Sequence, residues 1–156
     1  MTRLGLVLAA MLGPASLMAP APAAAQDAGV TGAAEAAFPN GATFNGISLK
    51  GLTLGQGMFI AQDGSATGQF QAVLQGTSAL GTPQNVTVEG EVRGGSVGAD
   101  GSATFSGTAT VDMGDGTLPL PGVPFTVTAS AGSLGLILNA VALPTATLSA
   151  GSITVK

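Results

Sequence analysis

The chain has 156 residues and contains no cysteine, histidine, tryptophan or tyrosine, and its eight acidic side chains outnumber four basic ones for a net charge of −4. The absence of cysteine excludes disulfides, and the absence of both cysteine and histidine excludes the usual zinc and copper ligand sets. So few cations also exclude the cationic stripe that nucleic acid or an anionic membrane surface requires.

Residues 1–25 have the features of a secretory signal peptide. Thr2-Arg3 supplies the positive charge, Leu4 to Leu12 form a short apolar run, and Ala23-Ala24-Ala25 ends a small-residue cleavage region. The apolar run is shorter than the roughly 20 residues that a membrane-spanning helix needs. We therefore expect cleavage after Ala25, no membrane span after it, and a protein that is secreted, periplasmic or at the cell surface.

The next segment, residues 26–41 (QDAGVTGAAEAAFPNG), is small, polar and without a clear pattern. Such a composition is typical of a flexible tether. We therefore expect a flexible linker over 26–41, followed by a single all-β domain over 42–156.

From residue 42 onward, apolar and polar residues alternate with a period of two, which is typical of strands with one buried face. The clearest run places Val86, Val88 and Val92 on one face. Near Lys50 the apolar positions change from odd to even numbers at Gly51, which predicts a bulge or a bend. Similar alternation occurs over residues 70–74, 103–111, 123–127, 134–138 and 153–155.

Asp-Gly pairs separate several of these runs, at Asp63-Gly64, Asp100-Gly101 and Asp115-Gly116. Glycine tolerates the positive φ that tight hairpin turns need. The spacing predicts an antiparallel β-sandwich of about eight strands, with a closed β-barrel as the alternative. The segment from Asp63 to Thr67 recurs from Asp100 to Thr104, either because two hairpins are related or because such turns are common in a Gly- and Thr-rich chain.

The core is expected to be lean. Gly and Ala at many inward positions would either let two sheets approach closely or leave a cavity. The aromatic residues expected in the core are Phe44, Phe59, Phe70, Phe105 and Phe125.

Glu89 and Glu91 are the nearest thing to a catalytic pair. Their side chains leave one face of the same strand about 7 Å apart, between the spacings of retaining and inverting glycosidases. Arg93 follows on that face, and the alternation places all three side chains in water. We therefore expect a solvated strand face rather than a catalytic site.

Asp112 and Asp115 flank a Gly-rich turn and are weak candidates for calcium ligands. The spacing of an EF-hand and its distal Glu are missing, so we expect a hairpin turn without metal. Lys50 is the remaining partner for a Ser-Lys dyad, but its position beside Gly51 at a bend predicts exposure. The sequence therefore predicts no catalytic residue and no cofactor.

Two segments, ATFSGTATV (103–111) and GSITV (151–155), resemble the last strands of small all-β domains in exported bacterial proteins of unknown function. The resemblance covers about the last third of the chain. It implies an envelope or extracellular context and supplies no catalytic residue.

These features lead to the hypothesis of an exported, non-enzymatic β-sandwich that acts as a structural or binding module of the bacterial envelope or extracellular space. Its partner there is unknown, and nucleic acid is not expected. One alternative is a carrier that holds a small molecule or lipid in a β-barrel cavity. A second alternative is a subunit of a surface fibre or array that pairs through open strand edges.

Overall fold

The computed structural model describes residues 27–156, and the predicted signal peptide lies outside this range. The described chain contains no helix long and apolar enough to cross a membrane. Its strands are β1 (Ala28–Ala37), β2 (Thr43–Phe44), β3 (Ile47–Ile60), β4 (Ser65–Thr77), β5 (Pro83–Val97), β6 (Ala103–Asp112), β7 (Leu120–Ala129), β8 (Ser133–Leu138), β9 (Val141–Ala142) and β10 (Ala146–Val155).

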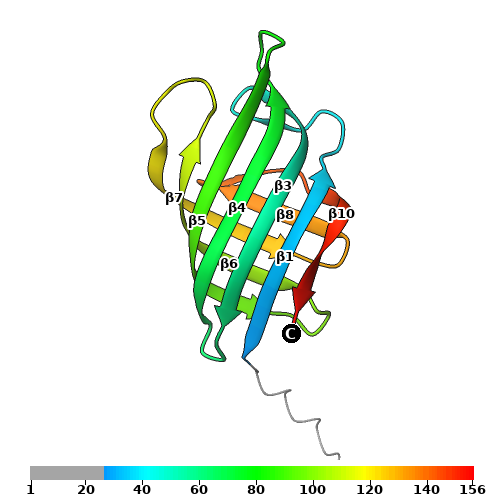
Figure 1. Cartoon of the computed structure of the whole chain (residues 1–156), viewed down its shortest axis with the longest axis vertical. Coiled ribbons are helices and arrows are strands. Elements are labelled where there is room, and N and C mark those ends of the chain that lie inside the picture. Colours follow the sequence, from blue (N-terminus) through cyan, green and yellow to red (C-terminus); the bar gives the residue numbers. More distant parts are fainter. Residues whose placement is uncertain (1–26) are drawn as a thin grey trace, which may run out of the picture.

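The strands pair antiparallel and close on themselves. Neighbours follow the order β1-β10-β8-β7-β6-β5-β4-β3, and β3 pairs in turn with β1. Figure 1 shows β1, β3, β4 and β5 as one layer, with β6, β7 and β8 running obliquely across behind it. The predicted antiparallel all-β fold is confirmed, and its two layers belong to one continuous ring of hydrogen bonds.

Strand β1 corrects the prediction of a flexible linker over residues 26–41. Ala28–Ala37 pair with β3 on one side and with β10 on the other, so this segment closes the ring. Its inward side chains, among them Val30, Ala34 and Ala36, are buried. Alanine alternating with Gly, Thr and Glu gives little contrast in hydropathy, which explains why the pattern resembled a tether.

The alternation predicted for the later strands agrees with the observed burial. Val86, Val88 and Val92 of β5 point inward and are buried. The predicted irregularity near Gly51 is a register shift between Leu49 and Gly51 in the pairing of β3 with β4. This bulge moves the inward positions of β3 from odd to even numbers.

Three phenylalanines form the centre of the core. The ring centroid of Phe70 lies 5.7 Å from that of Phe105 and 5.5 Å from that of Phe125. Phe59 was expected in the core and is not there, because it stands at an outward position of β3 and is 49% exposed. Phe38, which the sequence assigned to the linker, is buried instead.

Glycine lets the layers of the ring approach closely at Gly90. A Cβ atom built on Gly90 would lie 2.6 Å from Cε1 of Phe125. Glycine at this inward position is therefore required by packing, since the ring of Phe125 occupies the space that a side chain would use.

Three of the hairpins use the same five-residue turn. In each, the first residue donates its N–H to the carbonyl of the fifth at 2.8–2.9 Å, and the fourth is a glycine with positive φ. The predicted turns at Asp63-Gly64 and Asp100-Gly101 are two of them. The segments are Ala61–Ser65, Ser78–Thr82 and Gly98–Ser102.

Candidate functional site

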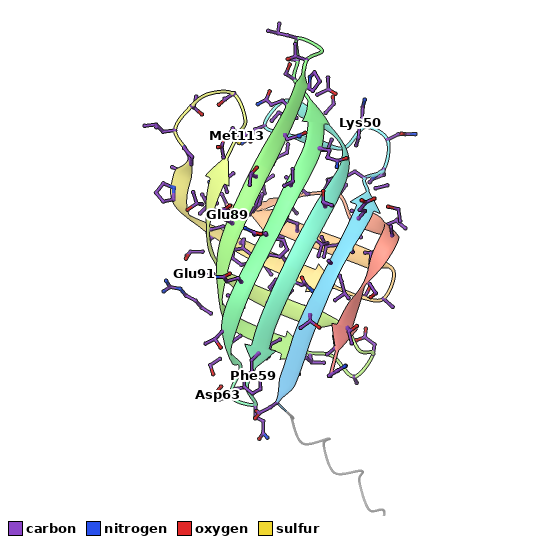
Figure 2. All side chains as sticks on the ribbon, viewed as in Figure 1. Lys50, Phe59, Asp63, Glu89, Glu91 and Met113 are labelled. Carbon is purple, nitrogen blue, oxygen red and sulfur yellow. The ribbon has the colours of Figure 1, made fainter. Side chains whose placement is uncertain are left out.

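Glu89 and Glu91 lie on the outer face of β5, as predicted (Figure 2). The nearest cation is Arg93, whose Nη2 lies 3.8 Å from Oε2 of Glu91, with the two side chains 70% and 75% exposed. An ion pair in water at this distance contributes little to stability. The strand face is solvated, as the alternation predicted.

Each glutamate stands in a row with one glutamine and one threonine from the neighbouring strands. The rows follow from the register of β4, β5 and β6, which are paired in sequence. Together these side chains surround a shallow hollow of about 380 Å³, here called the polar hollow. The rows are Gln69-Glu91-Thr108 and Gln71-Glu89-Thr110.

The polar hollow offers hydrogen-bonding groups rather than a catalytic constellation. Amide, carboxylate and hydroxyl groups supply both donors and acceptors. A glycosidase instead needs its two carboxyl groups on opposite sides of a cleft, one of them in an apolar pocket. Glu89 and Glu91 project from one strand into a polar setting, so the arrangement can bind polar groups but lacks that geometry.

Asp112 and Asp115 brace the loop between β6 and β7. Oδ1 of Asp112 accepts the N–H of Gly114 at 2.8 Å. Oδ1 of Asp115 accepts the N–H of Thr117 at 2.9 Å and its hydroxyl at 2.6 Å. Within residues 27–156, no three Asp or Glu side chains are grouped in a way that could hold a metal ion. Both candidate ligands therefore have a structural role in the loop.

The arrangement at Asp115, here called the turn brace, recurs in two of the hairpin turns. In it, Oδ1 of an aspartate accepts the hydroxyl and the N–H of the residue two positions later. Oδ1 of Asp63 accepts the hydroxyl of Ser65 at 2.6 Å and its N–H at 2.9 Å. Asp100 makes the equivalent contacts with Ser102. The hydrogen bond from the serine hydroxyl has the larger effect and the one from the backbone N–H the smaller effect. Both stabilise the carboxylate and hold the pKa of Asp63 and of Asp100 below the ordinary value of 3.8. These aspartates stabilise turns and lie apart from the polar hollow.

Lys50 is exposed at the bulge of β3, as expected. Figure 2 shows Lys50 toward one border of the front layer, which is formed by β1, β3, β4 and β5. Glu89 and Glu91 lie at the opposite border. The structure therefore does not bring the candidate cation to the candidate carboxylates.

Strand β10 has an open edge that the sequence pattern did not reveal. It pairs with β1 from Thr147 to Val155, but with β8 only at Ala146 and Thr147. Among the described residues, no strand pairs with the second edge of β10 beyond Leu148. The C-terminal half of β10 is consequently a sheet edge within an otherwise closed ring.

The polar backbone groups on this open edge can be identified from the register. Gly29 and Lys156 exchange both hydrogen bonds, at 2.8 and 2.9 Å. Because facing pairs in an antiparallel ladder alternate between bonded and non-bonded, the N–H and C=O groups of Ile153 and Val155 point away from β1. A further strand would find its hydrogen-bonding partners there.

An apolar hollow of about 540 Å³ adjoins the end of this edge. Ile60, Val97 and Val155 are among the residues that line it. The chemistry-bearing side chains of the described chain thus lie on an outer sheet face, in turns and beside a strand edge.

Comparison with protein-family models, curated proteins and solved structures finds no match for this chain.

Proposed function

We propose that the protein is an exported, non-enzymatic structural module of the bacterial envelope or extracellular space, and that two copies join along β10. The observation that carries the proposal is the open edge of β10. Unpaired strand edges are templates for pairing with another chain. Pairing of two identical edges about a two-fold axis would extend the sheet of one copy into the other.

The chemistry of the edge favours such pairing. Ser149 to Val155 contain no charged residue and no proline, the usual protections against edge pairing. An antiparallel pairing centred on Ser152 would set Thr154 opposite Ala150, so no like charges would meet. A bulge at Ser149, opposite the Glu35/Ala36 step, limits the paired stretch to the residues after it.

Apolar surface beside the edge would be covered by the same pairing. Ile153 and Val155 are only partly buried, although both contact the core. The apolar hollow lies next to Val155. Burial of this surface supplies a hydrophobic contribution in addition to the backbone hydrogen bonds.

The packing of the interior supports a module rather than a carrier. Phe70, Phe105 and Phe125 fill the centre of the ring with their rings in mutual contact. Because Gly90 has no Cβ, the ring of Phe125 occupies the space beside it, and no lumen is left there. A small-molecule or lipid carrier would instead need a cavity at this place.

A surface array is a second candidate, supported by the same edge. Pairing of two β10 edges is isologous and closes after two copies, so a fibre or array needs an additional contact between dimers. Assembly beyond a dimer would favour this candidate.

The proposal is tested by sedimentation velocity on the purified protein over a wide concentration range. We expect a concentration-dependent dimer in the parent protein. Ile153→Pro removes an N–H that faces the open edge and should give a monomer. Ile153→Ala truncates the same side chain but keeps that N–H, so this matched control should still associate.

A clean monomer at the highest concentration would contradict pairing along β10. The same conclusion would follow if Ile153→Pro, shown to be folded by its melting transition, associated as strongly as Ile153→Ala. Turnover of a broad panel of esters, glycosides and peptides by the parent protein would contradict the non-enzymatic part of the proposal.

A further inference from the structure

We propose that a groove across the outer face of the front layer binds a neutral polysaccharide chain. The polar hollow continues into a second hollow of about 280 Å³, which also has Gln71 and Glu89 in its lining and adds Thr53. A third, also about 280 Å³, shares Thr53 with the second and extends to Glu35 and Gly151. Successive hollows share lining residues and so adjoin one another; together they are here called the polar groove, although Leu54 and several alanines contribute much of the lining of the second and third.

The polar groove runs across the strands rather than along them. It passes from β6 over β5, β4, β3 and β1 to β10, which are neighbours in that order. With strands roughly 4.8 Å apart, these five steps cover about 24 Å along the curved surface of the ring. An open depression of this length suits a segment of an extended polymer better than a small molecule.

Gly55 forms the floor of the groove on β3, and Gly57 lies on the same outer face beyond the groove lining. Gly55 lies between Ala33 of β1 and Gln71 of β4, and Gly57 lies between Thr31 and Gln69. A Cβ atom on either glycine would meet no atom within 4 Å. The backbone is exposed at the floor, and longer polar side chains stand beside it. This shape allows a sugar ring to approach the sheet closely.

The walls carry groups that are free to bind hydroxyls. Glutamine amides donate and accept, threonine hydroxyls do both, and carboxylates accept. Within residues 27–156, no hydrogen bond joins the side chain of Gln71, Glu89 or Thr110 to another protein group. A sugar chain, which presents many hydroxyls and no charge, matches this mixture of donors and acceptors.

The charges of the groove argue against anionic ligands. Glu35, Glu89 and Glu91 line it, and neither lysine nor arginine does among the described residues, so an anionic polymer would be repelled. Arg93 lies 3.8 Å from Glu91 at one end and offsets part of the negative charge there. The uncharged amides and hydroxyls outnumber the carboxylates, which favours a neutral chain.

An exposed aromatic ring lies on the same face, outside the lining of the groove. Phe59 is two residues beyond Gly57 on the same outer face of β3 and faces Gly29 and Thr67 in the neighbouring strands. Figure 2 shows Phe59 on the same layer as Glu89 and Glu91, toward its lower end. The exposed ring can stack on the apolar face of a sugar, so it offers a separate contact four residues along β3 from Gly55.

The test is affinity electrophoresis of the purified protein in native gels that contain hydroxyethylcellulose, laminarin, galactomannan or, as the anionic polymer, alginate. We expect retarded migration with at least one neutral polysaccharide and none with alginate. Gly55→Leu fills the floor and should lower the affinity about tenfold or more, a change of about 1.4 kcal/mol.

Gly135→Leu is the matched control. Gly135 is an outward position of β8 in the other layer, where a Cβ atom would meet only Thr128 at 3.9 Å. The same substitution there should leave migration in the neutral gels unchanged. Ile153→Pro, compared with its own migration in a gel without polysaccharide, should still be retarded in the neutral gels, so failure of the groove and failure of β10 pairing are distinguishable.

Each contrary outcome overturns the inference. Migration that no neutral polysaccharide retards would show that the groove does not bind such a chain. Equal retardation of Gly55→Leu and Gly135→Leu would place the binding elsewhere. Retardation by alginate, or heat on titration with oligolysine but not with a neutral oligosaccharide, would assign the groove to a charged ligand.

Discussion

Glycines at inward and outward positions of this ring differ in what a side chain would meet. Gly90 points inward, where a Cβ atom would lie 2.6 Å from Cε1 of Phe125, whereas Gly55 points outward with no atom within 4 Å. The ring of Phe125 is itself held by Phe70 at a centroid distance of 5.5 Å, so it cannot move away freely. Glycine is therefore a packing requirement at one site and a conformational cost at the other.

Gly90→Ala should lower the free energy of unfolding by about 1–3 kcal/mol, because the added methyl overpacks the core. Gly55→Ala is the control and should be neutral or stabilise by about 0.4–1 kcal/mol through the unfolded chain. Urea unfolding of both variants measures the difference. Equal stability of the two would show that the layers do not pack against each other at Gly90.

Gln56 is the one residue whose buried side chain breaks the pattern of an apolar interior among the described strands. It is 9% exposed on the inward side of β3, and neither its Oε1 nor its Nε2 has a hydrogen-bond partner. A buried amide without partners costs about 1–3 kcal/mol. Its position opposite Gly32 and Phe70 leaves it among apolar side chains and backbone.

Gln56→Leu should therefore raise the free energy of unfolding by about 1–3 kcal/mol. Gln75→Leu, at an exposed position of β4, serves as the control and should change stability by no more than about 0.5 kcal/mol. Thermal and urea unfolding provide the measurement. A loss of stability in Gln56→Leu would mean that the amide makes contacts in solution, for example with an internal water.

At the scale of the element, the three five-residue turns provide an internal comparison. The third position holds Asp63 and Asp100 in two of them and Leu80 in the other. In the third turn, Oγ of Ser78 accepts the N–H of Thr82 at a longer 3.3 Å and forms a hydrogen bond of 2.7 Å with its hydroxyl, and the side chain of Leu80 is 91% exposed. The turn geometry thus does not require leucine, and an aspartate would brace it better.

Leu80→Asp should stabilise the protein by about 0.5–1 kcal/mol at neutral pH, because charge-assisted hydrogen bonds from the N–H and hydroxyl of Thr82 to the carboxylate would replace the neutral ones to Ser78. The pKa of the new carboxyl should be lowered in the folded state, as the pKa of Asp63 is by Ser65. The folded state then binds fewer protons than the unfolded state. The gain is therefore present above the ordinary value of 3.8 and is lost as pH falls through the lowered folded pKa.

Urea unfolding of Leu80→Asp and of the parent, at neutral pH and in strong acid, measures this gain. Leu80→Asn is the control, since it keeps the acceptor oxygen without the charge, and its effect should not follow the carboxyl titration. A stabilisation by Leu80→Asp that persisted in strong acid would contradict the turn brace.

Local pattern predicted the elements where side chains differ strongly between the two faces. In β5 the contrast between Val88 and Glu89 is large, and the predicted burial was correct. In β1 the inward residues Ala34 and Ala36 are small, so hydropathy predicted a tether. Phe59 was misplaced because it was assigned to the core as an aromatic residue, although the change of parity predicted at Gly51 already places its side chain outward.

At the scale of the whole molecule, ring closure and the polar groove depend on pairings that no local pattern contains. β1 and β10 come from opposite ends of the described chain, and their register decides that Gly32 faces Ile153. The polar groove exists because Gln71, Glu89 and Thr110 occupy one row across three strands. The sequence pattern predicts that each of these residues is an outward polar position. It does not predict that they lie side by side, because that depends on the register of β4 with β5 and of β5 with β6.

The ring is closed unevenly, which predicts where it opens. β5 is paired along its length with β4 and β6, whereas β8 and β10 meet only at Ala146 opposite Leu134 and Thr147 opposite Ser133. One more hydrogen bond, from the N–H of Leu148 to the carbonyl of Gly132 at 3.0 Å, adds to this junction. Segments with few paired neighbours open locally at a lower free energy than the global transition.

Native-state hydrogen exchange should therefore show faster exchange for the amides of Ala146 and Leu148, which face β8, than for those of Val86 to Val92. Exchange in β5 should follow global unfolding, so Gly90→Ala should accelerate it and leave the junction amides unchanged. The junction opens without breaking the core formed by Phe70, Phe105 and Phe125, because these rings lie on β4, β6 and β7. If both groups of amides had the same opening free energy and responded equally to Gly90→Ala, the ring would be one cooperative unit and the junction would not be its weak point.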